Sequence, residues 1–145
     1  MAYATYEFYR NTYYGNSIEE ADFNKLLSKS ETIINRYTFN RLIKNMPEDE
    51  STQRQIGMCA CELAEKVMEI DKYIKASTIN DKGETVMIKS KSAGSESVTF
   101  ATGETIYARL VNDNKALETF YYATVKNYLA GYDDAEGINL VYAGV

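Results

Sequence analysis

The stretch IGMCACELAEKVMEIDKYI, residues 56–74, decides the fold class of this chain. Its apolar residues recur in steps of four and three, the spacing that forms one continuous seam along a helix. They are Ile56, Ala60, Leu63, Val67, Ile70 and Ile74. No glycine or proline occurs between Met58 and Lys82, so nothing interrupts the pattern. The sequence therefore predicts a long helix over about residues 47–75, beginning where Pro47 and three carboxylates suit a first helical turn.

A second helical pattern precedes this one. The apolar residues are Ile18, Phe23, Leu26, Leu27, Ile33, Ile34, Tyr37 and Leu42. Ser17 and Glu20 have the spacing of a capping box, which predicts that the helix begins near Ser17. Further along, helical spacing returns from Glu104 to Val111 and again from Leu117 to Leu129, with Gly131 as the expected cap.

The remaining segments are predicted to be non-helical. Residues 1–16 hold many tyrosines and end in the turn signal Gly15-Asn16, which indicates a short strand or an irregular docking arm. Residues 76–103 are rich in Ser, Thr, Gly and Lys, and Thr85–Lys89 and Ser97–Phe100 alternate as hairpin strands do. Residues 132–145 predict an apolar, extended docking tail. The expected fold is mainly α: one domain over residues 1–145, a small helical bundle with a β-hairpin loop and extended terminal arms.

Composition excludes several classes of function. The chain of 145 residues has no histidine, so the usual acid–base catalysts and histidine-containing zinc sites are excluded. Its net charge of -5, with no basic run, argues against tight nucleic-acid binding. Cys59 and Cys61 point about 200° apart on a helix, which excludes a disulfide or a shared metal between them. The chain has no signal-peptide pattern and no long apolar span, so we expect a protein made in the cytoplasm.

The search for catalytic groups ends without a site. Acidic clusters at Glu19-Glu20 and Glu48-Asp49-Glu50 lie where helix N-termini favour negative charge in any case. Lysines at 82, 89 and 91 beside many hydroxyls could form a Ser-Lys pair or meet DNA phosphates, but a solvated hairpin whose alternate residues face water is the favoured interpretation. Tyr121, Tyr122, Tyr128 and Tyr132 could stack on bases, but they share the helical stripe of the core. We expect no enzyme activity, cofactor or metal.

Three stretches together resemble one family, the head-to-tail connector or adaptor proteins of tailed phages and Gram-positive prophages. They are YATYEFYRNTYYGNSIEEADF at 3–23, IKSKSAGSESVTF at 88–100 and NLVYAGV at 139–145. The resemblance implies a ring of about twelve copies in the virion, between the portal and the stopper or tail proteins, through which double-stranded DNA passes. It also implies that Leu140, Val141, Tyr142 and Val145 dock on the portal.

Contacts between subunits, or with the next ring, are expected from the arm and the loop. The candidates are Tyr3, Tyr6, Tyr9, Met87, Ile88, Lys89, Lys91 and Val98. The thirteen tyrosines favour an assembling protein. The phenol group of tyrosine has an apolar aromatic face and a polar hydroxyl, which suits the boundary of a protein interface. Two alternatives stay open: another tail-completion or tail-terminator protein, expected to carry more strand, and a small acidic helical interaction module that acts in solution.

Overall fold

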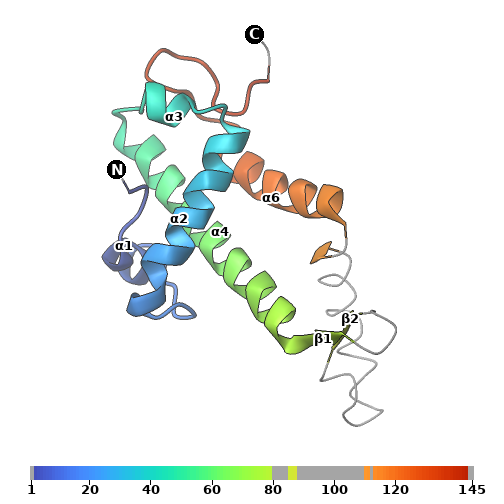
Figure 1. Ribbon diagram of the computed structural model, residues 1–145. Helices are drawn as coiled ribbons and strands as arrows, with labels where there is room; N and C mark the ends of the chain where they lie inside the picture. Colours follow the sequence, from blue (N-terminus) through green and yellow to red (C-terminus); the bar gives the residue numbers. More distant parts are fainter. Residues whose placement is uncertain (1, 80–84, 88–109, 112, 144–145) are drawn as a thin grey trace. The chain divides into compact units, whose positions relative to one another are not determined.

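The computed structural model describes residues 2–79, 85–87, 110, 111 and 113–143 (Figure 1). Its described part is mainly helical, as the sequence predicts. The helices are α1 (Tyr6–Asn11), α2 (Glu20–Tyr37), α3 (Arg41–Lys44), α4 (Glu50–Ala76) and α6 (Asn114–Leu129). The chain divides into two compact units, unit 1 with residues 1–67 and 121–145, and unit 2 with residues 68–120.

Helix α4 confirms the seam read from the sequence. Five of the six predicted seam residues are buried. The prediction is wrong only for Ile74, since half of the surface of this side chain is exposed. The helix begins three residues later than Pro47 predicted, because the Asp49 carboxylate accepts hydrogen bonds from the backbone N–H and the hydroxyl of Thr52, both at 2.9 Å. Cys59 and Cys61 are both free and fully buried, so α4 is covered on more than one side within unit 1.

Helix α2 begins later than predicted. Its N-cap is Glu19, with no side-chain cap hydrogen bond, so the capping box at Ser17 is wrong. The backbone N–H of Ser17 instead donates to the hydroxyl of Tyr9. The helix ends at Tyr37 because Phe39 and Asn40 turn the chain with φ of 57° and 59°, and the short helix α3 follows. Most of the predicted stripe is buried, including Phe23, Leu26, Leu27 and Ile34.

Residues 2–16 form neither a strand nor an irregular arm, so this prediction is wrong for the described part of the segment. Residues 6–11 form helix α1, capped by the Thr5 hydroxyl, which accepts from the N–H of Phe8 at 3.0 Å. Tyr9 is fully buried against Phe23, with 5.3 Å between ring centroids. The segment folds back because Tyr9 provides unit 1 with one of its largest core side chains.

The C-terminal segment is compact, so the predicted extended tail is also wrong over residues 132–143. Asp133 bridges Asn139, Gly137 takes a φ of 83°, and Leu140 is fully buried. Figure 1 draws this loop beside α3. Gly131 has no left-handed φ, so the residue that turns the chain is Gly137, not the predicted helix cap.

Unit 2 contains a small antiparallel hairpin. Strand β1 (Ser77–Ile79) pairs with β2 (Thr85–Met87) in the register Ser77 to Met87. Strand β2 covers the first three residues of the expected strand Thr85–Lys89, but it pairs with residues 77–79 and not with Ser97–Phe100, so the expected hairpin of those two segments stays a prediction. The other predicted strand, Ser97–Phe100, and the helical turn at 104–109 lie outside the described residues. Helix α6 begins after Asp113, whose carboxylate accepts from the backbone N–H groups of Lys115 and Ala116.

Candidate functional site

The candidate site is a surface that α3 and the C-terminal loop form together in unit 1. Arg41 joins these segments, since its guanidinium donates to the backbone carbonyls of Asn139 at 2.9 Å and Leu140 at 3.1 Å. The loop is also fixed to the segment after α3, because the N–H of Ala135 donates to the carbonyl of Asn45 at 3.0 Å. Two parts of the chain nearly a hundred residues apart thus present one surface.

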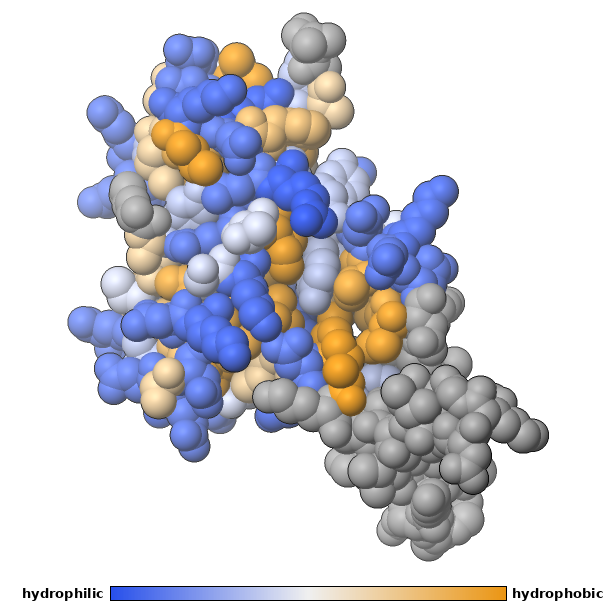
Figure 2. Space-filling model, viewed as in Figure 1, coloured by the Kyte–Doolittle hydropathy of each residue, from blue (hydrophilic) through white to orange (hydrophobic). Residues whose placement is uncertain are grey.

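Apolar side chains on these two segments face solvent. They are Phe39, Ile43, Ile138 and Tyr142, whose exposed fractions run from 41% for Ile138 to 66% for Ile43. We call these four side chains the terminal apolar patch. Figure 2 shows apolar side chains among hydrophilic ones over α3 and the C-terminal loop. Exposed apolar side chains that gather on one surface are typical of contact sites.

Arg41 orders part of the patch. Its guanidinium carbon lies 5.1 Å from the centroid of the Phe39 ring and 5.9 Å from that of Tyr142. Cation–π attraction at these distances holds both rings against one fixed cation. Phe39 also has a left-handed backbone, a conformation that is costly for an aromatic residue. The two aromatic anchors of the patch are therefore ordered before any partner arrives.

The predicted portal-docking residues fall into three groups. Tyr142 is exposed and belongs to the patch, and Val141 is half-buried. Leu140 is fully buried beneath its own chain, so its assignment as a contact residue is wrong. Val145 lies outside the described residues. Sequence reasoning missed Phe39, Ile43 and Ile138, because the apolar helical pattern continues from Tyr37 to Leu42 and gives no sign of the turn at Phe39 and Asn40.

The predicted inter-subunit tyrosines are largely engaged inside unit 1. Tyr9 is fully buried and is therefore a core residue, which corrects its assignment as a contact. The half-buried Tyr6 donates to the carbonyl of Ile18 at 3.0 Å, and the half-buried Tyr3 donates to the side chain of Asn35. Met87 lies in β2, and Ile88, Lys89, Lys91 and Val98 lie outside the described residues.

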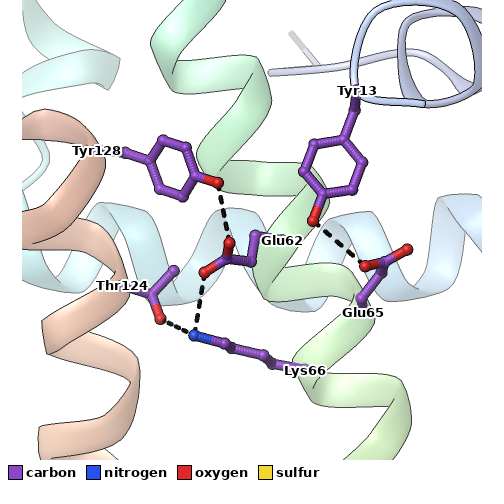
Figure 3. Close-up of polar contacts among 6 residues, drawn as sticks. All are labelled: Tyr13, Glu62, Glu65, Lys66, Thr124 and Tyr128. Atoms are coloured by element: carbon purple, nitrogen blue, oxygen red, sulfur yellow. Dashed lines mark hydrogen bonds and ion pairs between the residues drawn. The ribbon is translucent and has the colours of Figure 1, made fainter. Parts of the chain in front are cut away.

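A polar network joins α4 to the N-terminal segment and to α6 (Figure 3). Glu65 accepts from the hydroxyls of Tyr9 at 2.8 Å and Tyr13 at 3.3 Å. Glu62 accepts from Tyr128 at 2.9 Å and forms an ion pair with Lys66 at 3.0 Å. These bonds tie three segments of unit 1 together through two carboxylates on one helix.

The network holds its phenols in the protonated form. Burial, and then the hydrogen bond to Glu65, raises the pKa of Tyr9. Burial also raises the pKa of Tyr13, with Glu65 and Glu62 adding to the shift, and the pKa of Tyr128, where the hydrogen bond to Glu62 comes next. Burial followed by Glu65 raises the pKa of the Cys61 thiol to about 12, and burial raises that of Cys59. The raised pKa of both thiols disfavours the thiolate, which is the nucleophilic form of cysteine, and the hydrogen bonds of this cluster join the segments of unit 1.

Other functional features were sought in the described part of the chain. No helix there is long and apolar enough to cross a membrane. No three carboxylates or thiols within the described ranges come close enough to share a metal ion. Comparison of the chain with family models, with curated proteins and with solved structures gave no match.

Proposed function

We propose that this protein is a structural ring subunit of a phage head-to-tail connector, which docks beneath the portal through the terminal apolar patch. The observation that carries the proposal is the ordered pair Phe39 and Tyr142, held around Arg41 on the surface of unit 1. It stands beside the resemblance of residues 139–145 to the closing motif of the connector family. The portal, the stopper or tail proteins and DNA that passes without sequence-specific contacts are the proposed partners.

The patch suits a docking role physically. Aromatic residues with a polar tip and a neighbouring arginine are the residue types enriched in the cores of interfaces. Because Arg41 already fixes both rings, docking would cost little side-chain entropy. Ile43 and Ile138 add apolar area that a partner would remove from water. The helical character of the described residues weighs against the tail-terminator alternative, for which we expect more strand.

The proposal is tested by mixing the purified full chain with its portal and imaging the particles by negative-stain electron microscopy. The expected result is an added ring of density on the portal. Tyr142→Ser and Ile138→Ser together should reduce the fraction of decorated portals at least about tenfold, as loss of central interface residues does. Tyr14→Ser is the matched control, since Tyr14 is 81% exposed and lies outside the patch. Undecorated portals with the wild-type chain, or equal decoration with the patch variant, would contradict the proposal.

A further inference from the structure

Arg41, beside the terminal apolar patch, uses only part of its hydrogen-bonding capacity. Of its three side-chain nitrogens, only Nη1 donates within the described part of the chain, to the carbonyls of Asn139 and Leu140. Among the described residues, the one buried side-chain nitrogen or oxygen without a hydrogen-bond partner is Oδ2 of Asp134. Nε and Nη2 of Arg41 are therefore open to solvent, although the residue as a whole is half-buried.

The two open nitrogens form a fork of fixed position. Nε and Nη2 lie on one edge of the planar guanidinium, and their N–H groups match the two oxygens of a carboxylate. The guanidinium is held by its bonds to the C-terminal loop and by the rings of Phe39 and Tyr142, 5.1 and 5.9 Å from its carbon. Because the fork is already ordered, binding a carboxylate there would cost little side-chain entropy.

The segments that carry the patch have positive charge, although the chain as a whole is acidic. The net charge of the chain is -5, but residues 32–47 contain no acidic side chain and hold Arg36, Arg41 and Lys44. Arg36 and Lys44 are both exposed. No charged side chain follows Glu136 in the C-terminal loop. A partner with complementary charge would therefore bring a negative group to this surface.

We propose that the terminal apolar patch binds a segment of a partner protein in which an acidic side chain stands beside apolar ones. The carboxylate accepts two hydrogen bonds from Nε and Nη2 of Arg41, and the apolar neighbours cover Ile43 and Ile138. These two exposed aliphatic side chains favour a protein segment over a nucleic acid, whose phosphates bring no comparable apolar group. The inference rests on the proposed docking role of the patch and states what the partner presents there.

The carboxylate should contribute more here than in an ordinary surface ion pair. An exposed pair contributes little, because water competes for both charges and two long side chains lose their freedom. Arg41 is half-buried and fixed, and a partner seated on Ile43 and Ile138 would exclude water around it. The acidic side chain should therefore decide which segments bind.

The test is a two-dimensional ¹H–¹⁵N NMR titration of the full chain with two probes, N-acetyl-Leu-Glu-Leu-amide and the neutral N-acetyl-Leu-Gln-Leu-amide. Saturable shifts are expected at the amides of residues 39–43 and 139–142. The Gln probe should bind about tenfold more weakly than the Glu probe. Arg41→Lys keeps the charge but removes the fork, so it should reduce this preference to about threefold or less. Arg54→Lys is the matched control, the same change at an exposed arginine outside the patch, and should keep the full preference.

Several results would overturn the proposal. They are equal affinity of the wild-type chain for the two probes, shifts confined to other residues, and a full preference in Arg41→Lys. Patch shifts with a thymidine oligonucleotide but not with the Glu probe would make a nucleic acid the partner, and patch shifts with protein concentration alone would make it a second copy. Where Arg41→Lys loosens the loop and weakens both probes, the preference of the wild-type chain decides.

Failure of this inference can be told apart from failure of the proposed function, because the titration contains no portal. Decorated portals together with equal binding of the two probes would overturn the acidic segment alone. A preference for the Glu probe together with undecorated portals would overturn the connector role and leave the acidic segment standing.

Discussion

Gly15 and Tyr9 show at the scale of single residues why the N-terminal segment belongs to the core. A Cβ atom added to Gly15 would lie 2.1 Å from Cε1 of Tyr9, far inside van der Waals contact. The ring cannot move aside easily, since its hydroxyl accepts from the N–H groups of Ser17 and Ile18 and donates to Glu65. Only a residue without a side chain fits at this position.

We therefore expect Gly15→Ala to destabilise the protein by about 3 kcal/mol, the upper range for overpacking a rigid core. Gly131→Ala is the matched control, because nothing lies within 4 Å of its added Cβ and its φ is ordinary. Its free energy of unfolding should change by less than about 0.5 kcal/mol. Urea denaturation followed by circular dichroism measures both values. Equal stability of the two variants would show that Tyr9 can leave its place without cost.

At the scale of elements, the sequence predicted what depends on periodicity and missed what depends on distant contacts. The α4 seam was correct because its spacing repeats over five turns of one helix. Helix α1 was missed, although its tyrosines have helical spacing, because a six-residue helix is stabilised by the tertiary contacts of Tyr9 and not by its own propensity. The compact C-terminal loop was missed because Arg41, which fixes it, lies 98 residues away from Asn139.

The contact between α4 and α6 predicts how stability depends on alkaline pH. The pKa of Tyr128 is raised in the folded protein, by burial first and then by the hydrogen bond to Glu62. Below the ordinary tyrosine pKa of about 10, folded and unfolded chains both keep the proton, and the stabilising effect is complete. Above that pH only the unfolded chain loses the proton, so stability falls as pH rises.

Tyr128→Phe should accordingly change the pH dependence as well as the stability. The variant should be less stable near neutral pH by about 1 kcal/mol, because the hydrogen bond to Glu62 is lost. It should also lose less stability than the wild type between about pH 8 and 11, since one shifted phenol is gone. Urea denaturation at several pH values gives both quantities. An identical alkaline loss in the two proteins would mean that Tyr128 ionises as freely in the folded chain as in the unfolded one.

At the scale of the whole molecule, most of the buried apolar side chains among the described residues belong to unit 1. Of the buried hydrophobic side chains in the described part of the chain, only Ile70 and Leu110 belong to unit 2. The places where the chain leaves and re-enters unit 1 are close together, because Lys66 Nζ donates to Thr124 Oγ1 at 2.5 Å. A short bridge can therefore replace residues 68–120 without stretching unit 1, and a shorter loop costs less entropy to close.

A chain with residues 68–120 replaced by a Gly/Ser linker of about eight residues should still fold, because such a linker has an end-to-end distance of about 15 Å, enough to join two backbone segments whose side chains meet. Dispersed amide signals in ¹H–¹⁵N NMR and a single cooperative urea transition are the expected results.

Removal of residues 2–16 is the informative contrast. This deletion is shorter, but it removes Tyr9, whose hydroxyl donates a hydrogen bond to Glu65 and whose ring packs against Phe23. That shorter deletion should abolish cooperative unfolding, whereas a folded, cooperative product would show that the N-terminal segment is a dispensable arm after all.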